Sequence, residues 1–406
     1  MSVIRMAWRN LWRHPVRSGL IGLSVAIGLA AGLFVLSIYR GMVESRLRTV
    51  IDAEVGHVQF HAQGFKPDLE AKYLLSSTTL LREAFQTDWR VKKIGWRSVC
   101  EGMLSCAAGT AGVVVQGVNM REESSVSLLS DKIVDGAIDT NASSRMVLIG
   151  KKLADKQRLQ VGSKLVLMVV DSSGELASAA FRVGGIFQSS NTPFDQRNIY
   201  VSSAILNDLL GIGVRDAHEC VVLLQADELT DSFTVQYQRR FPLLQVEGWR
   251  SLSPETDLLV SAVDGYSIIV LVLIFLALSF GIINTLLMSV LERRQEFGMM
   301  MALGMNRLRV FRLVMLETFF LVLAGLPVGS FISWAVIGYY QRVGIDFSQR
   351  SPDLMRSFGF ESVLYPSFPS DRLFSIAGVV MITILLSGLF PAWRVLRWSP
   401  SDAMRK

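Results

Sequence analysis

Residues 265–304 read GYSIIVLVLIFLALSFGIINTLLMSVLERRQEFGMMMALG. The first 27 of these residues, Gly265 to Leu291, carry no formal charge. A helix rises about 1.5 Å per residue, so about 20 apolar residues are enough to cross the hydrocarbon of a bilayer. The sequence therefore predicts a transmembrane helix here, with a charged segment directly after it.

The charged segment, residues 292–312, alternates charged and apolar residues at helical spacing. One interpretation is a basic intracellular loop that follows the positive-inside rule. The other, which we favour, is a short amphipathic helix on the membrane face, with Met300, Leu303 and Met305 toward the lipid and the charges toward a soluble partner. Glycine tolerates a positive φ, so Gly298 and Gly304 would let the chain turn at either end of this helix.

Three more uncharged runs are long enough to span a membrane, namely Ser18 to Tyr39, Thr318 to Gln341 and Leu373 to Trp393. Half of the residues are hydrophobic and the mean hydropathy is +0.38, which is typical of a membrane protein. The four runs hold no charged residue or histidine, which argues against an ion or proton pathway. The expected transmembrane helices are residues 18–41, which include the start of a stalk, and residues 265–291, 313–341 and 373–393.

The short segments at one end of these predicted helices carry arginine and lysine. They precede the first helix within residues 1–17, separate the second from the third within 292–312, and follow the fourth within 394–406. By the positive-inside rule these three segments lie in the cytoplasm, while residues 42–264 and 342–372 lie outside. We predict an interfacial helix in the first segment and a tail in the last. The net charge of +6 comes partly from these flanks, so we do not expect nucleic-acid binding.

The first predicted span carries small residues four positions apart in two rows. Small side chains let helix backbones approach closely inside a membrane. We therefore predict that this helix packs against another helix, from the same chain or from a second copy. The predicted packing residues are Gly22, Ala26, Gly28, Ala30 and Gly32.

Residues 42–264 are expected to form an extracytoplasmic domain of mixed α and β structure. Strand-helix-strand patterns occur at both ends of this region and surround a middle that is richer in strands. The pattern predicts two lobes, with lobe 2 (about 119–198) inserted into lobe 1 (about 55–118 and 199–250). A helix start at Ser253-Pro254 leads into the second span. Both connections to the membrane are therefore expected to be continuous stalk helices.

Two hairpins and a strand with two histidines are predicted inside this domain. The hairpins join 103–108 to 113–118 and 164–170 to 176–187. His57 and His61 are four residues apart, which on a strand is roughly 13 Å and too far for both to hold one metal ion. We expect both side chains to face solvent.

Motifs for nucleotide binding and hydrolysis are absent from the sequence. No G-x-x-x-x-G-K-[ST] phosphate loop, G-x-S-x-G elbow or H-E-x-x-H zinc motif occurs. We expect a non-catalytic chain without a cofactor or metal of its own. Cys100, Cys106 and Cys220 are an odd number in a region expected outside the cytoplasm, and the pattern leaves free thiols and a disulfide equally open.

Two parts of the sequence resemble one family. Residues 292–304 (ERRQEFGMMMALG) resemble the coupling segment of FtsX-like permeases, the membrane subunits of mechanotransmission-type ABC transporters. Residues 389–394 (LFPAWR) and 399–405 (SPSDAMR) resemble the closing motif of that family. The resemblance implies an α-helical membrane protein with four transmembrane helices, and a two-lobed, mixed α/β, MacB-like periplasmic domain inserted between helices 1 and 2.

The resemblance also implies the partners. The family works as a dimer of permeases, identical or different, with separate ABC ATPase subunits that hold ATP and magnesium. The ATPase would grip the cytoplasmic coupling helix. The residues that match the coupling segment are Glu292, Arg293, Arg294, Glu296, Phe297, Gly298, Ala302, Leu303 and Gly304.

The implied location is the bacterial inner membrane, with both termini in the cytoplasm. Only 17 residues precede the first uncharged run, so the layout is similar to the lipoprotein-releasing permeases rather than to the macrolide exporters, which carry the ATPase ahead of that span. The expected function is release of lipoproteins from the outer leaflet, with a lipoprotein and a periplasmic carrier as further partners. The alternatives are export of drugs or peptides from the periplasm, and mechanical signalling to a cell-wall hydrolase.

Overall fold

The computed structural model describes residues 3–13, 15–75, 78–127, 129–347, 352–370 and 373–396. The chain divides into two compact units. The helical unit comprises Met1–Val43, Ser261–Ile345 and Leu364–Lys406, and the sheet unit comprises Glu44–Val260 and Asp346–Val363. The second half of the predicted closing motif, residues 399–405, lies outside the described residues.

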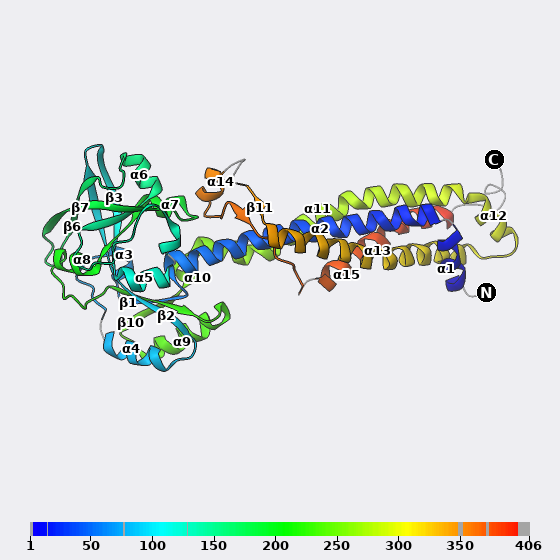
Figure 1. Ribbon diagram of the computed structural model, residues 1–406. Helices are drawn as coiled ribbons and strands as arrows, with labels where there is room; N and C mark the ends of the chain where they lie inside the picture. Colours follow the sequence, from blue (N-terminus) through cyan, green and yellow to red (C-terminus); the bar gives the residue numbers. More distant parts are fainter. Residues whose placement is uncertain are drawn as a thin grey trace. The chain divides into compact units, whose positions relative to one another are not determined.

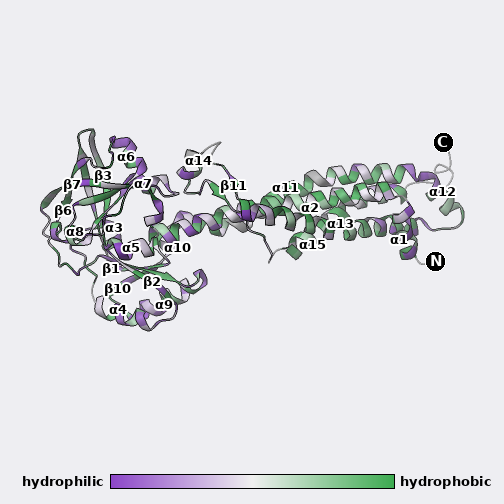
Figure 2. Cartoon of the chain, viewed as in Figure 1, coloured by the Kyte–Doolittle hydropathy of each residue, from purple (hydrophilic) through white to green (hydrophobic). Residues whose placement is uncertain are grey.

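Four long helices dominate the helical unit. They are α2 (Pro15–Thr49), α11 (Pro254–Glu292), α13 (Arg307–Val343) and α15 (Leu373–Leu396). Within the described residues, helices in these four places are long and apolar enough to cross a membrane, and Figure 2 shows their hydrophobic character. Each of the four predicted spans therefore lies on a candidate membrane helix, and three of the helices extend well beyond the uncharged runs because polar residues continue the same helical structure.

Two shorter helices complete the described part of the helical unit. α1 (Val3–Arg13) packs against α13, since the rings of Trp8 and Phe320 lie 5.4 Å apart edge to face. α12 (Arg294–Ala302) lies between α11 and α13 in the sequence. A core of apolar side chains from α2, α11, α13 and α15 holds the four long helices together.

The sheet unit is built on ten strands in one sheet (Figure 1). The order of nine strands is β10-β1-β9-β2-β3-β8-β5-β7-β4, and β6 pairs with β2 and β7. Among the pairings of this sheet within the described residues, β3 with β8 and β5 with β7 are parallel and the others are antiparallel. The strands are β1 (Val58–Ala62), β2 (Val91–Cys106), β3 (Gly109–Val118), β4 (Ile133–Gly136), β5 (Met146–Gly150), β6 (Lys164–Val170), β7 (Leu176–Phe187), β8 (Asn198–Ser202), β9 (Glu219–Leu224) and β10 (Leu244–Gly248).

Helices cover this sheet and enclose two main apolar cores. α4 (Thr78–Thr87) and α9 (Thr230–Arg240) lie over the end formed by β1, β9 and β10 (Figure 1). α6 (Lys151–Gln157) and α8 (Ser203–Leu209) contribute to a second core with β2, β3, β5, β6, β7 and β8. Strand pairing crosses the predicted lobe limits, because β2 pairs with β6 and β3 with β8. The division into the two lobes stays a prediction.

Short helices fill the remaining connections. In the sheet unit these are α3 (Phe65–Asp68), α5 (Met120–Val126), η2 (Leu129–Lys132), α7 (Thr192–Arg197), η3 (Asp227–Leu229), α10 (Trp249–Leu252) and α14 (Pro352–Ser357). A two-stranded sheet of β11 (Ile345–Asp346) and β12 (Val363–Leu364) flanks α14 in the sequence. α2 continues without interruption into a π-helix, η1 (Val50–Val55), which ends at Gly56 with a φ of 75°.

The two predicted hairpins both form. β6 and β7 begin and end where the sequence predicted, with Asp171 accepting hydrogen bonds in the turn from Ser173 and Glu175. β2 and β3 are longer than predicted, and their register places Cys106 opposite Gly109, so the turn is tighter than expected.

The prediction that His57 and His61 face solvent is wrong. β1 lies between β9 and β10, and His57 and His61 are 9% and 0% exposed. Period-two alternation of polar and apolar residues indicates one solvated face only when nothing covers that face, and here both faces of β1 are covered. Among the described residues, no group of three histidine, cysteine or acidic side chains could hold a metal ion, and the three cysteines are free thiols.

Candidate functional site

The predicted coupling segment forms a short helix between two long ones. α11 ends at Glu292, Arg293 joins it to α12, and α12 ends at Ala302. Gly304 then adopts a φ of 94°, a backbone conformation that favours glycine, as the sequence predicted for this turn. Asn306 caps α13 by accepting a hydrogen bond from the amide of Leu308 at 3.2 Å.

One face of α12 packs against the rest of the helical unit. Phe297 and Met301 are 1% and 7% exposed and pack into an apolar cluster with residues of α1, α11, α13 and α15. Leu303, which was expected to face lipid, is 85% exposed at the end of α12, while Met300 and Met305 pack partly against this cluster. Apolar residues lie all around this short segment, so sequence spacing alone could not decide which side is buried.

The exposed side of α12 combines a carboxylate with apolar side chains. Glu296, Met299 and Leu303 follow one another at spacings of three and four residues, and all three are exposed. Residues at such spacing share one face of a helix. Glu292, Ala302 and Gly304 are exposed as well, and Arg294 is half-buried. The prediction of a turn at Gly298 is wrong, because this residue lies buried inside α12, which begins at Arg294.

Arg293 points into the helical unit rather than toward a soluble partner. It is 8% exposed, and its Nη1 donates to Glu317 Oε2 at 2.7 Å while its Nε donates to Glu296 Oε2 at 3.0 Å. Glu317 Oε1 also accepts from Asn10 Nδ2 at 2.6 Å. These contacts join α1, the junction of α11 and α12, and α13.

Sequence reasoning missed the role of Glu317 in this network. The residue stands directly before the uncharged run that begins at Thr318, and it falls inside the predicted span 313–341. The sequence feature that could have indicated this role is a single acidic residue at the edge of an apolar helix, because a carboxylate near the membrane needs a partner of opposite charge. A cavity of about 40 Å³ lies beside Asn10, Arg293 and Glu317, which is large enough for a water molecule.

The small residues of the first span lie against two different helices. A Cβ added to Gly325 would stand 2.9 Å from the carbonyl oxygen of Gly22, and one added to Gly329 would stand 2.8 Å from that of Ala26. α2 and α13 therefore approach each other closely where α13 carries Gly325 and Gly329. Gly32 instead contacts α11, since its added Cβ would stand 3.5 Å from Leu271.

The other two predicted packing residues lie in the same helix. Gly28 is buried and Ala30 is half-buried. Beside the contact of α2 with α13, an apolar groove of about 380 Å³ is lined by residues of α1, α2 and α13, Trp12, Gly19 and Val328 among them. Side chains added at Gly19 or Gly22 would meet no atom within 4 Å, so this part of α2 is open.

Comparison with protein families gives two matches that together cover most of the chain. The family model described as MacB-like periplasmic core domain matches residues 18–238, and that described as FtsX-like permease C-terminal matches residues 268–400. The first match alone covers more than half of the 406 residues.

Several curated relatives are lipoprotein-releasing system transmembrane proteins named LolC. That of Neisseria meningitidis serogroup B is 23% identical over 94% of this chain and 92% of its own length. That of Xylella fastidiosa strain Temecula1 is 22% identical over 72% of both chains. That of Buchnera aphidicola is 20% identical, and the match spans only 63% of this chain and 62% of the relative.

Among solved structures, the periplasmic region of MacB from Actinobacillus actinomycetemcomitans matches 54% of this chain and 95% of its own length. The identity is 10% and the TM-score is 0.35. At this score the likeness decides nothing about the arrangement of the chain.

Proposed function

We propose, because the chain belongs to the family of ABC transporter permeases that join a MacB-like periplasmic core domain to an FtsX-like C-terminal region, that it couples ATP hydrolysis by a partner ATPase to the release of lipoproteins from a bacterial inner membrane. The observation that carries the proposal is the similarity to the LolC of Neisseria meningitidis over 94% of this chain. The chain itself is then a non-catalytic subunit, and ATP and magnesium bind to the ATPase.

The proposed topology follows from the distribution of arginine and lysine. Both termini and α12 lie in the cytoplasm, and the sheet unit lies in the periplasm. Cysteine labelling from outside tests this arrangement in intact cells. Ser172→Cys in the sheet unit is expected to react, and Asn306→Cys before α13 is expected to stay protected. Equal labelling at the two positions would contradict the topology.

The proposed contact with the ATPase is the exposed side of α12. Glu296, Met299 and Leu303 present a carboxylate next to apolar surface, which suits docking into a cleft of a soluble partner better than contact with lipid alone. Phe297 and Met301 anchor the other side of the helix in the helical unit. Two such permeases, identical or different, would engage two ATPase subunits.

The test of this contact is a change of charge on the exposed side of α12 and its C-cap residue. Glu296→Lys and Leu303→Asp are expected to insert normally and to lower both ATPase association and ATP-driven lipoprotein release in proteoliposomes at least tenfold. Glu228→Lys, an exposed charge reversal in the sheet unit, serves as the matched control and is expected to retain both. Wild-type activity in both α12 variants, at equal membrane abundance, would reject the contact.

The class of substrate is tested by what copurifies with the complex. A bound lipidated protein supports lipoprotein release. A bound drug or peptide would instead support export from the periplasm, and a bound cell-wall hydrolase would support mechanical signalling.

A further inference from the structure

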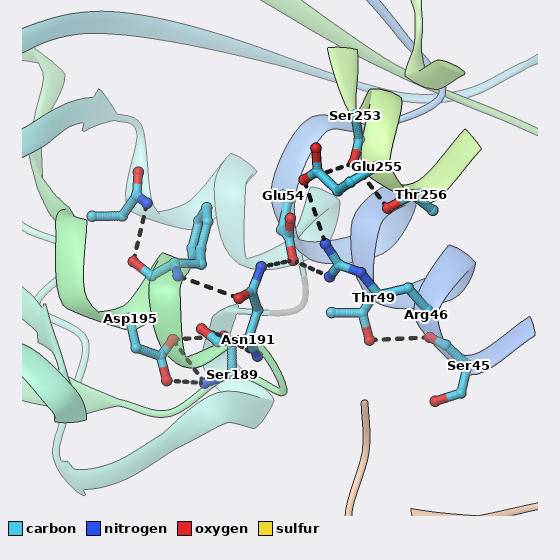
Figure 3. A network of polar contacts seen from close by, with 12 residues as sticks. Ser45, Arg46, Thr49, Glu54, Ser189, Asn191, Asp195, Ser253, Glu255 and Thr256 are labelled. Atoms are coloured by element: carbon cyan, nitrogen blue, oxygen red, sulfur yellow. Dashed lines mark hydrogen bonds and ion pairs between the residues drawn. The ribbon is translucent and has the colours of Figure 1, made fainter. Parts of the chain in front are cut away.

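Glu54, near the end of η1, accepts hydrogen bonds from two separate parts of the sheet unit (Figure 3). Its Oε1 accepts from Arg46 Nη1 at 2.8 Å and from Asn191 Nδ2 at 2.9 Å. The side chains of Arg46 and Glu54 are only 5% and 10% exposed. A buried carboxylate that accepts from a guanidinium and an amide is held in one orientation by directional bonds.

The π-helix places Glu54 where these bonds can form. Arg46 belongs to α2 and Glu54 to η1, eight residues later in the same continuous helix. π-helical turns are rare and occur frequently at functional sites. The main-chain carbonyl of Glu54 also accepts from Arg97 Nη1 at 3.2 Å, and Arg97 is itself paired with Glu123 at 2.6 Å. The helix end is therefore bonded to a buried ion pair at the centre of the sheet.

Asn191 connects Glu54 to α7. Its side-chain oxygen caps α7 by accepting from the backbone amide of Phe194 at 3.4 Å. The backbone amide of Asn191 donates to Ser189 Oγ at 3.0 Å. Asp195 in α7 accepts from the amide and the hydroxyl of Ser189, at 3.0 Å and 2.6 Å (Figure 3). The loop before α7 is thus fixed at both of its ends.

α7 in turn has little freedom to move relative to the sheet. A Cβ added to Gly150, at the end of β5, would overlap the backbone of Asp195, so helix and strand are in direct main-chain contact.

Arg46 makes a second connection, to the segment that follows α14. Gly359 has a φ of 77°, and a Cβ added there would stand 2.7 Å from Arg46 Nη1. Only glycine at this position leaves room for the guanidinium. α14 also lies against α7. Arg46, Glu54 and Asn191 therefore connect three parts of the sheet unit. These are the end of α2, α7, and residues 352–360, which contain α14 and form the α14 segment.

We propose that Arg46, Glu54 and Asn191 form a polar joint that makes α7 and the α14 segment follow any movement of the end of α2. The proposal rests on the proposed function and adds to it that ATP hydrolysis by the partner moves α2. The three residues are positioning residues, because they direct the displacement of other segments and touch no substrate. A buried ion pair contributes little more stability than apolar residues of similar volume, whereas its hydrogen-bond geometry fixes a direction.

The test compares hydrogen-deuterium exchange in the full complex with its ATPase, without nucleotide and after trapping with ATP, magnesium and vanadate. The polar joint predicts an ATP-dependent change in exchange at residues 189–197 and 352–360 of the wild type. Two variants break the joint. Arg46→Met combined with Glu54→Leu fills the site with apolar side chains of similar size, and Asn191→Ser keeps an oxygen that can cap α7 but lacks the amide that donates to Glu54.

The matched control is Asp88→Leu combined with Arg90→Met. It removes another largely buried ion pair of the sheet unit, with a distance of 2.6 Å and exposures of 12% and 13%. We expect both joint variants to reduce the ATP-dependent change at least fivefold, and the control to retain it. A purely structural role would instead affect thermal stability in joint and control variants alike and leave the ATP response in place.

The outcomes separate this inference from the proposed function. Joint variants that keep the wild-type ATP response overturn the polar joint, and so does a wild type that releases lipoprotein without any change at these segments. A wild type that shows the ATP-dependent change but releases no lipoprotein overturns the proposed function and leaves the joint supported. A complex with neither response overturns both.

Discussion

The contacts inside the helical unit differ in kind from the contacts inside the sheet unit. In the helical unit, Gly325 and Gly329 of α13 allow the backbone of α2 to approach at Gly22 and Ala26. In the sheet unit, the guanidinium of Arg97 is 2% exposed and is paired with Glu123. Close backbone packing stabilises the first unit, and paired buried charge is built into the second.

The difference follows from the solvent in which each unit is expected to fold. Lipid is as apolar as leucine, so helices in a membrane gain little from burying apolar area and associate through close packing instead. A domain in water gains from apolar burial and can bury a charge when a partner satisfies it. In the helical unit, the described charge network of Arg293 and Glu317 lies at the α12 end of the long helices.

Removing one member of the buried ion pair should have the largest effect. Arg97→Met removes the guanidinium that pairs with the buried carboxylates of Glu123 and Glu219. We expect this loss to lower the free energy of unfolding by about 3–5 kcal/mol. The measurement is thermal and chemical unfolding of the full chain in detergent. Arg197→Met is the control, because its pair with Glu101 is 67% and 64% exposed and contributes no more than about 1 kcal/mol. Equal losses in both variants would remove the contrast for the sheet unit.

Filling the glycine contact should break the packing of the helical unit. Gly329→Val introduces a Cβ about 2.8 Å from the carbonyl oxygen of Ala26, where neither backbone can yield easily. Overpacking of this kind costs about 1–3 kcal/mol. Gly338→Val on the same helix is the control, since a Cβ there meets no atom within 4 Å. Thermal stability and membrane abundance should fall in the first variant only, and a similar fall in the second would show that α13 is sensitive to any added side chain.

Protonation of a buried histidine should destabilise the sheet unit at low pH. Burial, assisted by the charge of Lys66, lowers the pKa of His61 from 6.5 to about 4. Its neutral form therefore contributes stability that is complete above pH 6.5 and is lost as the pH falls toward 4. Between pH 7 and pH 4.5 we expect the wild type to lose on the order of 2 kcal/mol more than His61→Gln.

Comparing wild type with His61→Gln at each pH cancels the contributions that other titratable groups make to the stability of both proteins. Burial raises the pKa of Asp195 to about 6, so this residue contributes stability below its unfolded pKa that is lost as the pH rises through about 6. That contribution has the opposite sign but is the same in both proteins. Parallel stability curves for wild type and His61→Gln would mean that folding does not lower the pKa of His61.

The turn after α12 should show the smallest effect. Gly304 has a φ of 94°, and any other residue there costs about 1 kcal/mol because its Cβ meets the backbone. Gly304→Ala is expected to lower the thermal midpoint by a few degrees without preventing insertion. Gly265→Ala, inside α11, is the control and should be neutral or slightly stabilising. A neutral Gly304→Ala would show that the turn adapts.

Local patterns were sufficient for several parts of the structure. The uncharged runs predicted four membrane helices, because a helix that crosses the hydrocarbon needs about 20 apolar residues in a row and few helices of water-soluble proteins have such a run. Alternating residues predicted β6 and β7 with their observed ends, because one side of that hairpin is solvated. The helix start at Ser253-Pro254 and the turn at Gly304 were predicted from single residues whose backbone preferences are strong.

Other features depended on which residues meet in space. The burial of His61, the inward direction of Arg293 and the buried face of α12 follow from neighbouring elements that no local pattern identifies. The polar joint brings together Arg46, Glu54 and Asn191, and Gly359 lies more than 300 residues from Arg46 in the chain. The sequence by itself determined the membrane helices and many of the strands, because length and periodicity are properties of one segment. Only the tertiary structure decided how charges are paired, because a buried charge is defined by partners that come from other segments.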